Sequence, residues 1–268
     1  MPPVRHQPRL QAWFGHLPLQ VDDLLLLERF QLLALPIRAP MPALGAVLAA
    51  DRRLRRFVET RCPELAPWIA EVVDLAGDDA HDLAAHRRTL VWELADWLVY
   101  QRFPGAYDGV QELWTTVEPF TEICELQGRT IVDVGAGTGR LTVALTRLGS
   151  AVFAVEPVGR LREHIARRAS DAKLDNLYPL DGYLHRIPLP PGSADVLVTS
   201  RAIGWQLEDE LTEVERVVSA GGWAIHLVGA PADGTQTELH ARLRARGYAA
   251  SRYCDETGWR QRYAKRIT

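Results

Sequence analysis

A glycine-rich segment at residues 131–141 is the strongest candidate for chemistry in this sequence. It reads IVDVGAGTGRL, so a β-branched run leads directly into a turn with three alternating glycines. Glycines there let the backbone turn sharply and approach a ligand closely. The spacing differs from the Gly-x-Gly-x-x-Gly of dinucleotide-binding folds, and no Lys-Ser/Thr pair follows as in a P-loop. Asp133, just before the glycines, would repel a pyrophosphate but suits a ligand with positive ammonium and sulfonium groups.

Two further carboxylates follow predicted strands. Glu156 ends the apolar run at residues 151–155 and lies 23 positions after Asp133 (156 − 133). An acidic residue at about this distance accepts the ribose hydroxyls of an adenosine cofactor. Asp181 follows the short run at residues 177–180 and precedes Gly182. The structural alternatives are a capping role for Asp133, an exposed strand end for Glu156 and a turn for Asp181.

The elements that would position these carboxylates alternate between strand and helix after Gly128. Strands are expected at 130–134, 151–155, 177–180, 195–199 and 223–228, with helices at 139–148, 160–169, 208–218 and 237–246. This alternation predicts an α/β fold with a doubly wound, mostly parallel sheet. Residues 248–254 and 261–267 could add an antiparallel hairpin at one edge.

The first half of the chain is predicted to be helical. Its apolar periodicity and its proline and glycine breaks predict five helices: Val21–Leu35, Pro40 to about Thr60, Leu65–Ala76, Asp79–Arg102 and Gly109–Leu126. We therefore expect an N-terminal helical domain at residues 1–126 and the α/β domain at residues 127–268.

The order of the motifs in the second half resembles the class I S-adenosylmethionine-dependent methyltransferases. The likeness rests on Asp133-x-Gly-x-Gly-x-Gly, then Glu156, then Asp181 with a downstream Ile-Pro and Asp-Val-Leu-Val. The segment EVERVVSAGGW at residues 213–223 is similar to that family's helix and glycine pair before the fifth strand. The resemblance covers roughly half the chain. It implies a Rossmann-like, seven-stranded sheet in the order 3-2-1-4-5-7-6.

The resemblance also implies a role for each motif. The methionine end and the backbone of S-adenosylmethionine would lie against Asp133, Gly135, Ala136, Gly137, Thr138 and Gly139. Glu156, with Pro157 beside it, would take the ribose hydroxyls. Asp181 would bond the adenine amino group, Gly182 and Tyr183 would line the ring, and Ser200 would line the methionine. The interval from Asp181 to Pro188 is about two residues longer than the common pattern, which leaves open which backbone amide meets the adenine.

Methyl transfer from a sulfonium needs little from the protein beyond geometry. The leaving group is neutral, so holding acceptor and methyl group in line can supply most of the catalysis. A base is needed only if the acceptor must lose a proton. The catalytic residue stays unassigned; the candidates by position are His185, Tyr107 and Arg201. Acceptor contacts are expected from Arg201, Trp205 and Tyr107. Simple exposure is the more common explanation for a histidine such as His185, and packing explains Tyr107 equally well.

Several absences narrow the acceptor. The segment TSRAIGW after the fourth strand lacks the Asn/Asp-Pro-Pro-Tyr/Phe motif typical of amino methylation of nucleic-acid bases, and it contains no cysteine nucleophile. Carboxylates do not cluster near Asp195, so the sequence does not suggest a catalytic metal. We therefore expect a small-molecule acceptor, no metal and no nucleic-acid partner, with the N-terminal helices setting specificity.

Composition fits an ordinary globular enzyme. The net charge of −3 does not favour a polyanion, and the three scattered cysteines do not suggest a disulfide framework or a zinc site. Because the sequence shows no signal peptide and no long apolar run, we expect a cytoplasmic protein with no membrane segment. The sequence leaves the oligomeric state undetermined. Two other functions remain: a non-catalytic protein that binds S-adenosylmethionine or S-adenosylhomocysteine, and an NAD-dependent oxidoreductase.

Overall fold

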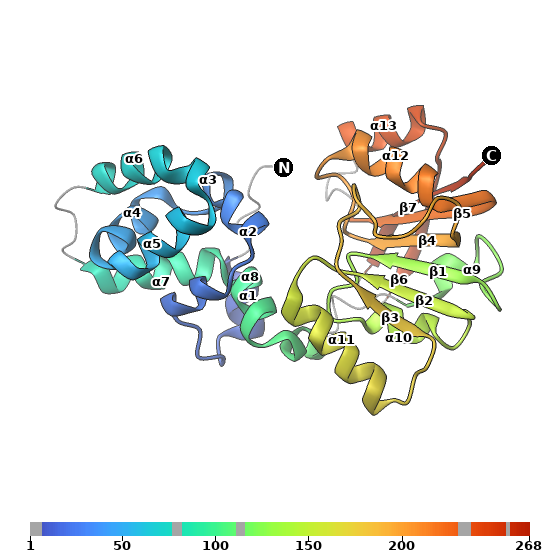
Figure 1. Cartoon of the computed structure of the whole chain (residues 1–268), viewed down its shortest axis with the longest axis horizontal. Coiled ribbons are helices and arrows are strands. Elements are labelled where there is room, and N and C mark those ends of the chain that lie inside the picture. Colours follow the sequence, from blue (N-terminus) through green and yellow to red (C-terminus); the bar gives the residue numbers. More distant parts are fainter. Residues whose placement is uncertain (1–6, 77–81, 111–115, 230–236, 256–257) are drawn as a thin grey trace. The chain divides into compact units, whose positions relative to one another are not determined.

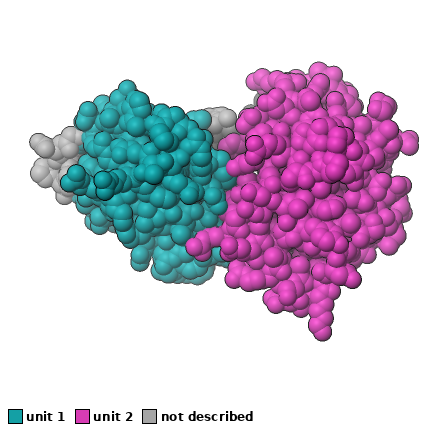
Figure 2. Space-filling view, in the orientation of Figure 1, with its two compact units in different colours: residues 1–109 teal, residues 110–268 magenta. Residues whose placement is uncertain are grey.

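The computed structural model describes residues 7–76, 82–110, 116–229, 237–255 and 258–268. It divides into two compact units, Met1–Gly109 and Val110–Thr268 (Figure 2). The boundary thus lies earlier in the chain than the division at residue 126 that the sequence suggested. Within the described residues, no helix combines the length and the apolar character that crossing a membrane would need.

Unit 1 is built from short helices around one apolar core. The elements are α1 (Gln7–Phe14), η1 (Val21–Leu26), α2 (Arg29–Leu33), α3 (Leu35–Arg38), α4 (Met41–Ala50), α5 (Arg52–Arg61), η2 (Pro63–Leu65), α6 (Ala66–Ala76), α7 (Leu83–Glu93), α8 (Ala95–Arg102) and η4 (Pro104–Gly109). Fully buried leucines from many of these elements meet in the core, among them Leu32, Leu48, Leu90 and Leu98.

The long helices expected in the first half are interrupted. The expected Val21–Leu35 helix is a 3-10 turn followed by two short helices, with Pro36 in the first turn of α3, where its missing N–H costs nothing. The helix expected from Pro40 to Thr60 breaks at Asp51, whose carboxylate caps α5. The helix expected through residue 102 breaks at Leu94.

The fifth expected helix, Gly109–Leu126, is also wrong. The described part of that range contains only one turn of helix, α9 (Glu118–Thr121), and residues 111–115 of it lie outside the described ranges. The short third helix, by contrast, is found where it was expected, as α6.

Unit 2 is the expected doubly wound α/β fold (Figure 1). Its sheet contains β1 (Thr130–Val134), β2 (Ala151–Val155), β3 (Leu177–Leu180), β4 (Ala194–Ser200), β5 (Val218–Val228), β6 (Ala249–Asp255) and β7 (Gly258–Arg266). The order is β3-β2-β1-β4-β5-β7-β6, with β1 to β5 parallel and β7 antiparallel to both of its neighbours. This confirms the mostly parallel seven-stranded sheet and the strand order.

Helices cover both faces of this sheet. Residues of α10 (Arg140–Leu145) and α11 (Gly159–Asp171) pack with side chains of one strand face, such as Val152 and Ala154. Residues of α12 (Leu207–Val217) and α13 (Glu238–Ala245) pack with the opposite face, which includes Val132 and Leu197. Strands buried on both faces must be apolar throughout. The polar residues that interrupt this pattern therefore stand out at the carboxyl ends of the strands.

Candidate functional site

The glycine turn after β1 is shaped by packing on both sides. Gly135, Gly137 and Gly139 have φ values of +73°, +57° and +76°, a region that other residues rarely adopt. A Cβ at Gly135 would overlap the Cβ of Ala202, and one at Gly139 would lie 2.7 Å from Cγ1 of Ile165. At Gly137 nothing lies within 4 Å of that position. The first and third glycines thus permit close packing, whereas the middle one leaves the backbone open to a ligand.

Asp133 lies in β1, one residue from the end of the strand, with only 2% of its surface exposed. Its Oδ2 accepts a 2.6 Å hydrogen bond from Oγ1 of Thr142 on α10. Burial raises the pKa of Asp133 to about 6, and the hydrogen bond from Thr142 opposes that rise. A buried carboxylate with so little compensation would be stabilised by a cationic ligand.

Glu156 follows β2 and is also buried, so it is not the exposed strand-end acid of the structural alternative. Its Oε2 accepts from the amide of Gly137 at 2.9 Å, and its Oε1 accepts from the amide of Val158 at 3.0 Å. Burial raises the pKa of Glu156 to about 7. A carboxylate offers about four lone-pair positions, so both oxygens can still accept bonds from ligand hydroxyls.

Asp181, after β3, is connected to Glu156 through Arg162 of α11. Nη1 of Arg162 donates to the carbonyl oxygen of Glu156 at 2.7 Å and to Oδ1 of Asp181 at 3.0 Å. The Asp181 side chain is 69% exposed, so it can also meet a ligand from solvent. The sequence does not indicate this role for Arg162, because its two partners follow two different strands.

The residues after Asp181 form a tight turn. Gly182 is closely packed: a Cβ there would lie 2.7 Å from Cδ of Pro188. Tyr183 and Arg186 exchange backbone hydrogen bonds of 3.2 and 3.0 Å. The Tyr183 ring stacks on His185 with 5.2 Å between ring centroids. Both rings are partly exposed.

Ser200 ends β4, directly beside the glycine turn in the sheet, because β1 pairs with β4. Arg201 has a φ of +62°, and its amide donates to the carbonyl oxygen of Leu227 at 2.9 Å. Trp205 is 73% exposed, a large apolar surface for a single residue. Arg201 and Trp205 thus lie on the loop that follows Ser200 at the end of β4.

Glu210 organises that loop, although the sequence did not suggest it. The side chain is almost fully buried on α12 and accepts from three successive backbone amides. The donors are Gly204 at 2.7 Å, Trp205 at 3.0 Å and Gln206 at 2.9 Å. A buried carboxylate fixes the loop in front of α12 in this way.

Tyr107 belongs to the core of unit 1. Its hydroxyl donates to the carbonyl oxygen of Asp96 at 2.8 Å, and its ring stacks on Tyr100 with 4.0 Å between centroids. Burial raises the pKa of Tyr107 well above its ordinary value, so the hydroxyl stays protonated at neutral pH. These contacts place Tyr107 among the buried residues of unit 1.

The geometry therefore joins most of the candidate residues of unit 2 into one edge of the sheet. Hydrogen bonds connect Asp133 to α10, Glu156 to the glycine turn, and Asp181 to Glu156 through Arg162. The donor set suits a ligand that carries both a positive charge and vicinal hydroxyls. Among the described residues, no group of three or more His, Cys, Asp or Glu side chains could hold a metal ion.

Comparison with known proteins gives a family match in the same part of the chain. Residues 132–226 match a family profile described as a methyltransferase domain. An uncharacterized methyltransferase of Bacillus licheniformis is 32% identical over 117 residues, which are 43% of this chain and 48% of the relative. A probable ribosomal RNA small subunit methyltransferase A of Methanospirillum hungatei is 37% identical over 76 residues, 28% of this chain and 30% of the relative. The chain thus spans half or less of the length of these relatives.

A solved structure has a similar fold. The crystal structure of a protein from Pyrococcus horikoshii OT3 superimposes with a TM-score of 0.50 and 14% sequence identity. The match covers 63% of this chain and 98% of that one. At this level of identity the likeness shows the fold and nothing further.

Proposed function

Because unit 2 contains a class I S-adenosylmethionine-dependent methyltransferase domain, we propose that this protein transfers a methyl group from S-adenosylmethionine to a small-molecule acceptor. One observation carries the proposal: two buried carboxylates, Asp133 and Glu156, flank an open glycine turn at the carboxyl edge of the sheet. Burial raises the pKa of both carboxylates, and the guanidinium of Arg162 near Glu156 opposes that rise only in part. A ligand with an ammonium, a sulfonium and ribose hydroxyls supplies what both groups lack.

Each residue then has a defined task. Asp133 attracts the positive methionine end, Glu156 accepts the ribose hydroxyls, and the open backbone at Gly137 allows close approach. Asp181, Gly182 and Tyr183 surround the adenine, with Arg162 orienting Asp181. Bound S-adenosylmethionine supplies a methyl group on a positively charged sulfur that leaves as a neutral thioether. The remaining task of the protein is to align the acceptor with that methyl group, which can lower the barrier substantially.

The acceptor contacts proposed for this reaction lie on the loop after β4. Arg201 and Trp205 follow Ser200, which would line the methionine, so they are suitably placed in sequence to meet an acceptor. Tyr107 is a weaker candidate, since its hydroxyl already donates to a backbone carbonyl. We propose that unit 1 contributes acceptor specificity, and that no dedicated base is required unless the acceptor must be deprotonated.

A small molecule is favoured over RNA as acceptor. The relative from Methanospirillum is described as a ribosomal RNA methyltransferase, and that makes RNA the main alternative. Proteins that bind RNA backbones generally use basic surfaces, whereas this chain has a net charge of −3 and a pI near 6.3. With three scattered cysteines and no Cys-x-x-Cys spacing, we propose a cytoplasmic location.

Calorimetric titration tests the cofactor assignment. Purified protein is titrated with S-adenosylmethionine and, separately, with NAD. We expect micromolar affinity for S-adenosylmethionine, about −8 kcal/mol, and no binding of NAD. Asp133→Ala should abolish the binding, and the same change at exposed Asp171 serves as the matched control. Binding of NAD alone would overturn the proposal in favour of an oxidoreductase.

Turnover separates an enzyme from a binding protein. Release of S-adenosylhomocysteine is followed over a panel of small hydroxyl-, amine- and carbanion-type acceptors, with ribosomal RNA included. Release of S-adenosylhomocysteine with a small molecule supports the proposal. Release with RNA alone would show that the acceptor is RNA and not a small molecule. Tight cofactor binding without turnover on any member of a broad panel would favour a non-catalytic binding protein.

A further inference from the structure

The segment between β3 and β4 packs against α12. Leu184 and Ile187 of this segment are buried in the same apolar cluster as Leu207, Leu211 and Val214 of α12. Apolar contacts of this kind hold a loop near a helix but do not fix its position along the helix axis. A polar network supplies that fixation.

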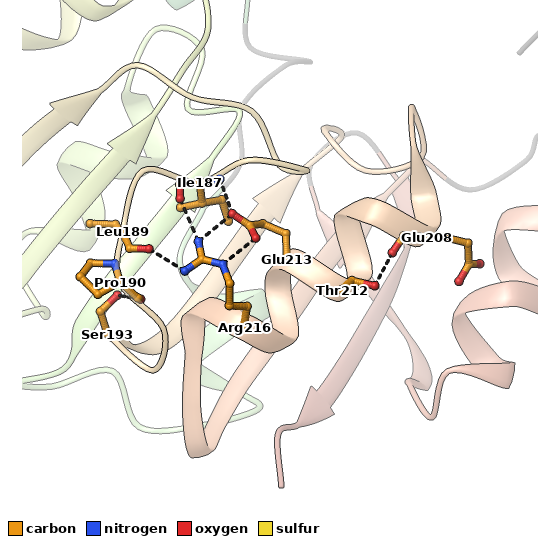
Figure 3. A network of polar contacts seen from close by, with 8 residues as sticks. All are labelled: Ile187, Leu189, Pro190, Ser193, Glu208, Thr212, Glu213 and Arg216. Carbon is orange, nitrogen blue, oxygen red and sulfur yellow. Dashed lines mark hydrogen bonds and ion pairs between the residues drawn. The ribbon is translucent and has the colours of Figure 1, made fainter.

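The network is built on one ion pair within α12, Glu213 with Arg216 (Figure 3). Arg216 donates two hydrogen bonds to Glu213, from Nε to Oε2 and from Nη2 to Oε1, both 2.7 Å long. The Glu213 side chain is only 13% exposed. A forked arginine–carboxylate pair is both directional and stronger than a neutral hydrogen bond. The pair is therefore a rigid unit on the helix.

The same two side chains hold the backbone of the loop. The amide of Ile187 donates to Oε1 of Glu213 at 2.7 Å, and the carbonyl oxygen of Ile187 accepts from Nη2 of Arg216 at 3.0 Å. Nη1 of Arg216 donates to the carbonyl oxygen of Leu189 at 2.9 Å. Farther along, the amide of Gly192 donates to the carbonyl oxygen of Arg216 at 2.8 Å. Four backbone groups of the loop are thus fixed to two residues of one helix.

A contiguous path leads from this network to the residues proposed to surround adenine. Pro188 lies between Ile187 and Leu189, whose backbone groups are held by α12. Its Cδ packs so closely against Gly182 that a Cβ on Gly182 would be 2.7 Å away. Gly182 also packs against Cγ1 of Val155, at the end of β2. The position of Asp181 and Tyr183 relative to β2 therefore depends on where Ile187 and Pro188 are held.

We propose that Glu213 and Arg216 are positioning residues for the cofactor: they act on cofactor affinity through Ile187 and Pro188 by fixing the turn at residues 181–183. The inference rests on the proposed function, since it assumes that this turn meets the adenine. Neither side chain touches the cofactor in this scheme. Their effect is transmitted through backbone groups and one packed proline.

Binding of S-adenosylhomocysteine to Glu213→Gln and Arg216→Gln protein tests the proposal. We expect the Kd of each variant to rise about three- to thirtyfold, the usual range for residues that act on a site indirectly. The Kd of 5′-methylthioadenosine, which keeps the adenosine and lacks the amino acid, should rise by the same factor. Arg216→Lys keeps the charge but cannot reach two carbonyl groups, so its Kd should be intermediate.

Glu208→Gln is the matched control. Glu208 lies on the same helix and forms an ion pair of the same length, 2.7 Å, but with Arg242 of α13 rather than with the loop. Its substitution should leave the Kd unchanged. Calorimetry also gives the fraction of competent sites, which separates positioning from loss of folded protein. A normal fraction with a raised Kd supports the proposal.

Two results would overturn the inference. One is a wild-type Kd in all the folded Glu213 and Arg216 variants. The other is a reduced fraction of competent sites with an unchanged Kd, which would indicate a purely structural role. Both leave the proposed function intact, because wild-type protein still binds. If wild-type protein binds no S-adenosylhomocysteine, the proposed function fails and this inference fails with it.

Discussion

Asp133 and Glu156 are ionisable groups in places where ionisation is costly, so their chemistry depends on pH. Burial raises the pKa of Asp133 to about 6 and that of Glu156 to about 7. In the unfolded chain both would ionise near their ordinary values of about 4 to 4.5. Below that range both groups are protonated in both states and folding carries no ionisation cost. As the pH rises toward 7, only the folded chain must place charge in a buried site.

Stability should therefore contain a component that is complete below about pH 4.5 and is lost as the pH rises through about 6 to 7. Glu156→Gln should remove the larger part of this pH-dependent component, because Gln does not ionise. Relative to this variant, the wild-type unfolding free energy should fall by roughly 3 kcal/mol between pH 4.5 and pH 8. Urea denaturation at several pH values measures it. Glu238→Gln, on an 85% exposed side chain, is the control; parallel curves for wild type and Glu156→Gln would contradict the assignment.

The glycines of the turn after β1 should differ sharply in their tolerance of alanine. The new Cβ of Gly137→Ala contacts no neighbour, so only the left-handed backbone should lower the unfolding free energy, by about 1–2 kcal/mol. Gly135→Ala has the same backbone strain and its Cβ also overlaps Ala202, so the unfolding free energy should fall by roughly 1–3 kcal/mol more. Urea denaturation compares the two. Equal losses would mean that Ala202 moves aside freely.

The sequence indicated the candidate residues of the proposed site, but not their hydrogen-bonding partners. Asp133, Glu156 and Asp181 became candidates because each follows a recognisable strand and the order of the motifs is specific. Thr142 and Arg162 complete the same site, yet their bonds join elements whose spacing in sequence has no fixed value. Glu213 and Arg216 did carry a signal, since a spacing of three on a helix favours an ion pair.

At the scale of elements, the two halves of the chain differed in how well their patterns could be read. Strands such as β1 and β2 are buried on both faces, so they appear as short, continuous apolar runs with clear ends. In unit 1 the apolar periodicity continues across helix breaks, because successive helices pack on one core. The break at Asp51 depends on a single capping carboxylate, and the break at Leu94 has no comparable marker.

Helix α12 offers a test at this scale, at its amino end. Glu210→Gln replaces a carboxylate that accepts three amides by a side chain with only one acceptor oxygen. We expect a loss of about 2 kcal/mol in the unfolding free energy and faster hydrogen exchange at the amides of residues 204–206. Affinity for S-adenosylhomocysteine should stay within about twofold of wild type, because this loop is proposed to face the acceptor. Unchanged exchange would show that the loop is held by other contacts.

At the scale of the whole molecule, the chain has separate apolar cores. Among the described residues, the buried members of the leucine-rich cluster of unit 1 run from Val21 to Leu98, and those of the clusters around the sheet run from Phe120 to Ile267. Each unit therefore has its own source of folding free energy. The proposed cofactor residues Asp133, Glu156 and Asp181 all belong to unit 2.

This separation predicts that residues 110–268 fold and bind cofactor without unit 1. The fragment should show a cooperative unfolding transition and the same Kd for S-adenosylhomocysteine as the full chain, within about twofold. Acceptor methylation should be lost or become less selective if unit 1 contributes specificity. Glu213→Gln in the fragment should raise the Kd by the same factor as in the full chain, since the network lies wholly within unit 2. A folded fragment with much weaker binding would instead assign part of the cofactor site to unit 1.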